Sequence, residues 1–231
     1  MISSPNNETL KEIRKLGGRR WRDKTREFVA EGEDLVAAAK AAGWAPSALL
    51  CAAGSGLEGE EVAPHLLAEI SLLGSSTREI GIYAQRWAPE PRGPFCVALW
   101  GVGDPGNVGT ILRSALAFGA ASVALGPKTA DPYGHKAVRA SMGAIFEMPI
   151  TRVRDAAELP GRRVALVARE GRPLQELENP GDAITLVVGA EREGLPDAVV
   201  AACDEVAHVP IRSESLNAAM AATVAMYEVT R

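Results

Sequence analysis

The chain has 231 residues, of which 47% are hydrophobic, and a formal net charge of −4 at pH 7. This length suits one large domain or two smaller ones, and the acidic balance argues against a protein that coats nucleic acid indiscriminately. Three widely spaced cysteines argue against a disulfide framework or a metal site. Neither a signal peptide nor an apolar run of about 18 residues is recognisable, so a cytoplasmic protein without a membrane span is expected.

Residues 9–28 form a basic segment in this acidic chain, with eight Lys or Arg against three Asp or Glu. A solvated helix face explains this charge as well as contact with RNA phosphates does. The candidates for RNA contact are Arg19, Arg20, Arg22 and Lys24. Apolar periodicity then predicts a small α/β unit. Its expected elements are helices at 31–43 and 62–73 and strands at 47–52 and 76–84.

Residues 86–94 contain three prolines and almost no apolar periodicity, which predicts a linker. We therefore expect two domains, residues 1–88 and residues 93–231. The second domain alternates apolar strands with helices, which predicts a parallel sheet covered on both faces. Its expected strands are 95–101, 122–126, 164–168, 185–189 and 205–210, and its expected helices are 109–118, 136–143, 195–202 and 216–228.

A glycine-rich turn follows the first strand of this domain. Gly101, Gly103 and Gly106 fit the GxGxxG pattern of dinucleotide-binding folds. The match is weak because Pro105 interrupts the turn and no acidic residue ends the next strand. A plain structural turn fits better, and an NADP-binding oxidoreductase remains a rival interpretation that only Lys128 supports.

The segment after these glycines points more clearly to a ligand. Asn107 is a candidate cap for a helix that begins near Gly109. Arg113 would then lie about one and a half turns into that helix, whose amino end faces the strand ends where open α/β sheets bind ligands. A surface salt bridge would also explain Arg113, but its apolar neighbours predict that it needs an anionic partner.

Two later segments repeat the pattern of a strand followed by a polar turn and a helix. In the first, the strand at 185–189 leads into Glu191 and Glu193. These two carboxylates would also be explained by the favourable interaction of negative charge with a helix amino terminus. In the second, Ser213 and Ser215 are candidate N-caps of the last helix. Asn217 would then lie in the first turn, where helix capping alone explains it poorly.

Together these segments resemble the SpoU branch of the SPOUT RNA methyltransferases over residues 95–231. The motifs that carry the resemblance are Asn107-x-Gly109-x-x-x-Arg113, Gly189-x-Glu191-x-x-Gly194-Leu195, and Pro210-Ile211 followed by Glu214-Ser215-Leu216-Asn217. The amino-terminal part is more faintly similar to the RNA-binding domain that is often attached to this family.

The resemblance implies a SPOUT-type α/β trefoil-knot domain with a parallel sheet, preceded by a small α/β RNA-binding domain. It further implies a homodimer that uses S-adenosylmethionine, without a metal, to methylate a ribose 2′-hydroxyl in RNA, with ribosomal RNA favoured over transfer RNA. By resemblance, the residues that hold the cofactor are Gly189, Ile211 and Leu216. The residues of the polar catalytic surface are Asn107, Arg113, Glu191, Ser215 and Asn217.

The chain departs from the family pattern in two places. Arg192 stands where many relatives have glycine, and the turn between Ile211 and Glu214 is about two residues shorter than in many relatives. A relative that binds RNA without catalysis is the second rival interpretation, and the intact polar set argues against it. By resemblance, Arg113 activates the hydroxyl. Because arginine almost never loses its proton, binding of the adjacent phosphate is the alternative role, and the sequence leaves both open.

Overall fold

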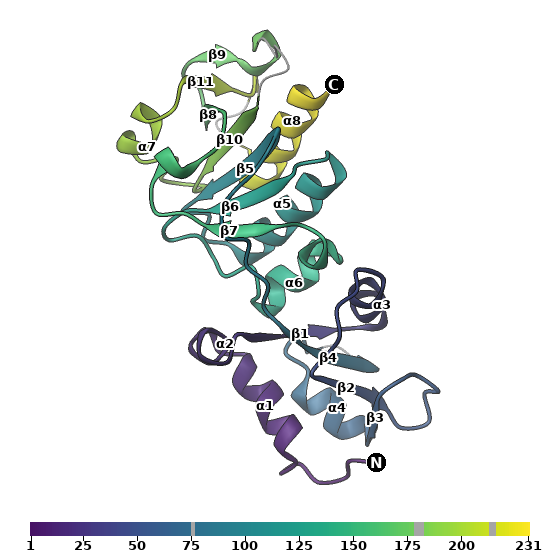
Figure 1. The fold of residues 1–231 in the computed structure, drawn as a ribbon. Coiled ribbons are helices and arrows are strands. Elements are labelled where there is room, and N and C mark those ends of the chain that lie inside the picture. Colours follow the sequence, from purple (N-terminus) through teal and green to yellow (C-terminus); the bar gives the residue numbers. More distant parts are fainter. Residues whose placement is uncertain (75–76, 178–182, 213–215) are drawn as a thin grey trace. The chain divides into compact units, whose positions relative to one another are not determined.

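The structure is a computed structural model that describes residues 1–74, 77–177, 183–212 and 216–231. Its contacts divide the chain into two compact units (Figure 1). The first unit comprises residues 1–85 together with 131–146, and the second comprises residues 86–130 together with 147–231. Among the described residues, no helix is long and apolar enough to cross a membrane.

The first unit is built on a four-stranded sheet in the order β1-β4-β2-β3. Strand β4 runs antiparallel to β1 and β2, and β2 pairs in parallel with β3. Its strands are β1 (Glu27–Glu31), β2 (Ala48–Ala52), β3 (Glu60–Val62) and β4 (Glu79–Ala84). Its helices are α1 (Glu8–Leu16), α2 (Arg19–Thr25), α3 (Glu33–Ala41), α4 (Pro64–Ile70), α6 (His135–Ser141) and the short η1 (Ala144–Phe146). The predicted helices and strands of this region are confirmed as α3, α4, β2 and β4.

Periodic apolar residues build the core of this unit. Leu10, Ile13 and Leu16 recur on one side of α1 and are each at most 1% exposed. They pack with buried residues of the sheet and of α4, including Ile80 and Leu67. Asn7 caps α1, because its side-chain oxygen accepts hydrogen bonds from the first turn of that helix.

Residues 131–146 belong to the first unit although the chain reaches them only after two strands of the second. The rings of Tyr133 and Phe146 lie 4.7 Å and 5.9 Å from that of Phe28. The Trp44 indole nitrogen donates a hydrogen bond of 2.8 Å to the Phe146 carbonyl oxygen. The sequence pattern placed all of residues 93–231 in one domain, and it gave no sign of this excursion.

The second unit contains a seven-stranded sheet, counted over the described residues, in the order β7-β6-β5-β10-β8-β11-β9. Every neighbouring pair is parallel, which confirms the predicted fold class. Its strands are β5 (Phe95–Trp100), β6 (Ser122–Leu125), β7 (Ile150–Arg152), β8 (Arg162–Val167), β9 (Arg172–Pro173), β10 (Ile184–Gly189) and β11 (Glu205–His208). Its helices are α5 (Pro105–Ala117), α7 (Asp197–Ala201) and α8 (Ala218–Thr230), with short turns η2 (Ala156–Glu158) and η3 (Leu174–Glu176).

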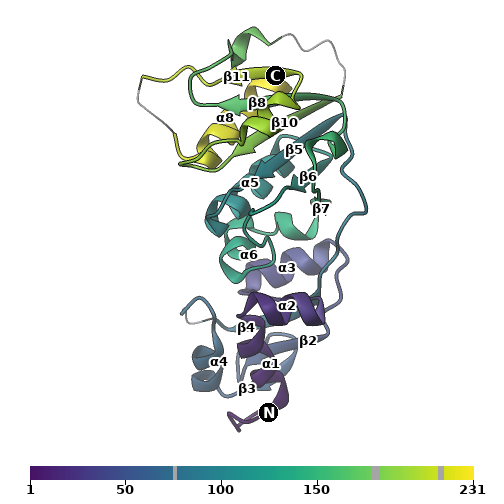
Figure 2. The same ribbon diagram turned by 90° about the vertical axis from the view of Figure 1, so that its left-hand side faces the viewer.

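Helices cover both faces of this sheet, as the continuous apolar strands predicted. Helices α5 and α8 pack against each other on one face (Figure 2). On the other face, Val199 of α7 and the nearby Leu195 pack on Ala98 and Val187 of the central strands. Strands β5 and β10 are buried along their whole length. The parallel order brings the carboxyl ends of the central strands to one edge of the sheet, where the predicted motifs lie.

Candidate active site

The glycine-rich turn after β5 is the start of α5. The side chain of Asp104 caps this helix, because its Oδ1 accepts a 2.9 Å hydrogen bond from the Asn107 backbone nitrogen. Pro105 occupies the first helical position, where its fixed φ and missing N–H are favourable. The predicted cap at Asn107 and the predicted start near Gly109 were therefore wrong. Asn107 lies inside the first turn, and its side chain is available to other partners.

The start of α8 corrects a second prediction. Asn217 is the N-cap of this helix, and its Oδ1 accepts hydrogen bonds from the backbone nitrogens of Ala219 at 2.9 Å and Met220 at 3.3 Å. It does not lie in the first turn, as the sequence pattern had suggested. The predicted caps Ser213 and Ser215, the second of which was also a candidate catalytic residue, lie outside the described residues.

Three of the predicted catalytic residues meet in one hydrogen-bonded chain. Asn217 Nδ2 donates to Asn107 Oδ1 at 3.0 Å, and Asn107 Nδ2 donates to Glu191 Oε1 at 2.5 Å. The amide orientations follow from the helix. Because Asn217 Oδ1 accepts from backbone N–H groups, its nitrogen must face Asn107, whose own nitrogen must then face the carboxylate. The amino end of α8 thus fixes the direction of both amides.

Glu191 is held on a closed loop between β10 and α7. Backbone hydrogen bonds join the Ala190 nitrogen to the Gly194 oxygen at 3.1 Å and the Gly194 nitrogen to the Ala190 oxygen at 3.0 Å. Gly194 has a φ of +67°, which favours glycine. Residues 190–194 are called the wall loop below.

The wall loop separates two clefts at the carboxyl edge of the sheet. The smaller cleft has a volume of about 580 Å³, and its polar lining includes the amide chain. Residues that line it are Gly101, Gly103, Asp104, Asn107, Asn217 and residues 190–193 of the wall loop. Asp104 was not among the predicted site residues, although an Asp-Pro pair before a helix was a recognisable capping signal.

The larger cleft has a volume of about 650 Å³ and contains all three predicted cofactor-binding residues, Gly189, Ile211 and Leu216. Leu166, Val188 and other apolar side chains complete much of its lining. A side chain at Gly189 would not fit, because its Cβ would lie 2.4 Å from the Gly194 carbonyl carbon. Residues 190–193 line this cleft as well as the smaller one.

Arg113 stands apart from this cluster within the chain. It lies on the exposed side of α5, opposite the buried Ile111 and Leu112, and it lines neither cleft. No hydrogen bond or ion pair joins its side chain to any described residue. The anionic partner that the sequence predicted is therefore not found in the described part of the chain.

The four candidate RNA contacts of the basic segment comprise one buried and three exposed side chains. Arg22 is 6% exposed, pairs with Asp131 at 2.8 Å and donates to the Leu16 carbonyl oxygen at 2.7 Å. This candidate RNA contact is corrected, since burial and pairing leave its guanidinium unavailable to a phosphate. Arg19 forms an exposed ion pair at 3.6 Å with Asp23. Arg20 is exposed, and the Lys24 ammonium lies 4.6 Å from the centre of the Trp21 ring.

Thiol and metal chemistry find little support in the described residues. Burial raises the pKa of the Cys96 and Cys203 thiols, so neither is a reactive thiolate near neutral pH. Within the described ranges, no group of three His, Cys, Asp or Glu side chains is placed to hold a metal ion. What the site offers is a pair of aligned amides, a carboxylate and two clefts that share a wall.

The comparisons with known proteins agree with this geometry. The SpoU rRNA Methylase family matches residues 94–227, and the MRM3-like substrate binding domain matches residues 7–91. The chain belongs to the SpoU rRNA methylase family. This membership confirms the resemblance seen in the sequence, and it leaves the glycine-rich turn as a helix start rather than a dinucleotide site.

Relatives match over nearly the whole chain. The chain is 31% identical to the 23S rRNA (guanosine(2553)-2′-O)-methyltransferase RlmP of Bacillus subtilis, over 99% of this chain and 98% of that protein. An AdoMet-bound rRNA methyltransferase from Sinorhizobium meliloti superposes with a TM-score of 0.89 and 31% identity, covering 99% of this chain and 96% of that one. The AdoMet complex of the SpoU methyltransferase AviRb from Streptomyces viridochromogenes gives 0.82 and 27%, covering 97% of each chain.

Proposed function

We propose that this protein methylates a ribose 2′-hydroxyl in ribosomal RNA with S-adenosylmethionine as the methyl donor. The observation that carries the proposal is the amide chain from Asn217 through Asn107 to Glu191 on the wall between two clefts. One cleft suits an adenosyl cofactor and the other a polar substrate. The name of the Bacillus subtilis relative favours ribosomal RNA over transfer RNA.

The larger cleft fits the cofactor. Its volume and its mostly apolar lining suit a nucleoside-sized ligand whose ring needs apolar contact. Gly189, Ile211 and Leu216 would hold it, with Gly189 presenting backbone alone. When bound, S-adenosylmethionine supplies an electrophilic methyl group, so the protein needs to align the acceptor oxygen rather than to create a nucleophile from a metal-bound water.

The smaller cleft fits the ribose. Asn107 and Asn217 present fixed amides, and Glu191 presents a carboxylate that can accept a hydrogen bond from a hydroxyl. Alignment of this kind lowers the activation barrier of a bimolecular reaction by on the order of 7–11 kcal/mol. Ser215 is assigned to this surface by the family resemblance, and it lies outside the described residues.

Arg113 would bind a phosphate of the RNA. Its guanidinium is exposed and unpaired within the described chain, and it presents N–H donors in a planar fork that suits a phosphate. A phosphate held by this guanidinium would fix the position of the adjacent ribose for methyl transfer. Arg19, Arg20 and Lys24 of the amino-terminal unit, which we assign to residues 1–88, would add contacts to the RNA backbone.

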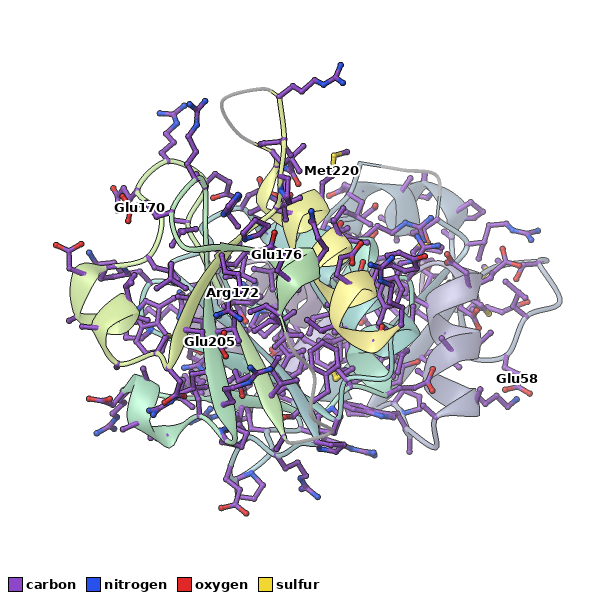
Figure 3. The ribbon with its side chains drawn as sticks, turned by 90° about the horizontal axis from the view of Figure 1, so that it is seen from above. Glu58, Glu170, Arg172, Glu176, Glu205 and Met220 are labelled. Carbon is purple, nitrogen blue, oxygen red and sulfur yellow. The ribbon has the colours of Figure 1, made fainter. Side chains whose placement is uncertain are left out.

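A homodimer is part of the proposal. Met220, Val224 and Tyr227 are 63%, 39% and 52% exposed on one side of α8, at the spacing that places them in one stripe. Figure 3 shows Met220 projecting from the amino-terminal part of that helix. An exposed apolar stripe of this kind is typical of an interface, and a second copy of the chain is the occupant that the family resemblance implies.

Two further features are proposed on the resemblance. The first is the trefoil knot of residues 93–231, which the match of residues 94–227 to the SpoU rRNA Methylase family supports. The second is a cytoplasmic location, the compartment in which such an RNA substrate would be met.

A methyl-transfer assay tests the proposed function. The protein, radiolabelled S-adenosylmethionine and total RNA from a strain that lacks the gene are combined, and the modified nucleotide is mapped. We expect label in ribosomal RNA on a 2′-oxygen, and no label on a synthetic target whose nucleotide is 2′-deoxy. Label on a base, or on the deoxy target, would contradict the proposal.

Variants assign the roles of the side chains in the same assay. Arg113→Ala is expected to abolish transfer while calorimetric binding of S-adenosylhomocysteine is unchanged, because Arg113 lines neither cleft. Arg20→Ala is the matched control, an exposed arginine of the other unit, and it should reduce transfer only modestly. Turnover near that of the wild type in Arg113→Ala would remove this residue from the mechanism.

A further inference from the structure

The larger cleft has a charged end that its apolar lining does not explain. Arg169 and Glu170 lie just after strand β8, separated from it by Ala168, and both are exposed side chains that line this cleft. Neither forms a hydrogen bond or an ion pair with any described residue. Figure 3 shows Glu170 on a loop at the outer edge, well apart from Arg172 and Glu205 of the neighbouring strands. A cation left unpaired beside a cleft is available to an anionic group of a ligand.

The backbone holds this loop in place. Gly171 has a φ of +77°, and a Cβ there would lie 2.1 Å from the Val206 carbonyl oxygen of β11. The loop therefore packs tightly against the neighbouring strand, and strand pairing continues at once with Arg172 opposite Ala207. The backbone is thus fixed two residues after Arg169, which limits the freedom of the loop and the entropy lost when it binds a ligand.

Two arginines line the larger cleft among the described residues, and their positions differ. Arg192 lies on the wall loop and lines both clefts, so it borders the place where the methyl group must meet the ribose. Arg169 lines the larger cleft and not the smaller one. A ligand group that stays away from the methyl-transfer position would therefore meet Arg169.

S-adenosylmethionine carries such a group. Its α-carboxylate is separated from the sulfonium by two methylene groups and the α-carbon, and it takes no part in the transfer. We infer that Arg169 binds this α-carboxylate and so distinguishes the intact cofactor from adenosyl compounds that lack the amino-acid arm. The inference rests on the proposed function, since it assigns one part of the cofactor to one end of the larger cleft. A guanidinium and a carboxylate form two parallel charge-assisted hydrogen bonds, which gives this contact its selectivity.

Calorimetry with two ligands tests the inference without RNA. S-adenosylhomocysteine keeps the amino-acid arm, whereas 5′-methylthioadenosine has a methyl group in its place and shares the rest. Arg169→Ala should weaken binding of S-adenosylhomocysteine by about tenfold and change binding of 5′-methylthioadenosine by less than about twofold. Arg169→Lys, which keeps the charge and loses the paired donors, should give an intermediate loss for S-adenosylhomocysteine alone.

Arg192→Ala is the matched control, because it removes the other arginine of the same cleft. It should leave the ratio of the two affinities as in the wild type. An unchanged ratio in Arg169→Ala, an equal loss for both ligands, or a selective loss in Arg192→Ala would each overturn the inference. Failure of the wild-type protein to bind either ligand would instead overturn the proposed cofactor, and this inference with it.

Discussion

The contact between Gly189 and the wall loop gives a prediction whose size follows from the structure. A Cβ at Gly189 would lie 2.4 Å from the Gly194 carbonyl carbon and 2.6 Å from the Leu195 nitrogen. Such atoms normally stay about 3.5 Å apart, so Gly189→Ala must push the loop away by roughly 1 Å. Overpacking of this kind costs about 1–3 kcal/mol. At about 2–4 °C per kcal/mol, the melting temperature should fall measurably.

The same displacement should be felt in ligand binding, because residues 190–193 line both clefts. We expect Gly189→Ala to lower the affinity for S-adenosylhomocysteine by at least about tenfold, a loss of about 1.4 kcal/mol. Gly194→Ala is a useful comparison. Its Cβ meets no atom within 4 Å, so it should incur only the strain of a left-handed backbone, about 1–2 kcal/mol.

Gly103→Ala is the neutral control, since its Cβ would lie 3.9 Å from the Gly101 carbonyl oxygen, an ordinary contact, and its φ is not positive. Thermal denaturation and calorimetry on the three variants separate clash from backbone strain. Wild-type affinity and melting temperature in Gly189→Ala would refute the reasoning, because they would show that the wall loop accommodates a Cβ at this position without cost.

Substitutions at three further positions test separate parts of the structure. Asn217→Asp should keep the cap of α8 and lose methyl transfer, because a carboxylate replaces the amide that donates to Asn107. Asn217→Ala should lose methyl transfer and also about 0.5–2 kcal/mol of stability, because the cap is removed. Methyl transfer by the aspartate variant would contradict the role of the amide. Arg22→Ala leaves the buried Asp131 carboxylate without its ion-pair partner and should lower the free energy of unfolding by about 3–5 kcal/mol in chemical denaturation. A loss below about 1 kcal/mol would contradict this prediction. Met220→Glu places a charge in the exposed stripe of α8 and should shift sedimentation towards the monomer, and an unchanged dimer would place the interface elsewhere.

The sequence predicted the second unit well because its signals are local. A run of apolar residues between turn residues, such as 95–101, identifies a buried strand without knowledge of its neighbours. The strands were expected to be parallel because helices separate them along the chain, and the sheet confirms it. Asn107, Glu191 and Asn217 were placed on one surface because each follows a strand end, and their hydrogen bonds bear this out.

The errors came from choices that local pattern leaves open. Asp104 and Asn107 are both good capping residues, and the helix begins at the first because Pro105 fits the position that follows. In the sequence Arg22 is one cation in a basic segment, and its partner Asp131 lies 109 residues away. No periodicity in either segment encodes that contact, since only the folded chain brings the two side chains together.

The excursion of residues 131–146 has a consequence for how this protein can be divided or recombined. The chain passes between its two units three times, so no single cut yields two complete halves. A fragment that ends at residue 85 would leave the ring of Phe28 without Tyr133 and Phe146, and the Trp44 indole without its acceptor. A gene fusion that exchanged only the amino-terminal stretch would lack the matching residues 131–146 that pack against it. Recombination between relatives is therefore expected to keep the two stretches together, and inheritance of one stretch should predict inheritance of the other.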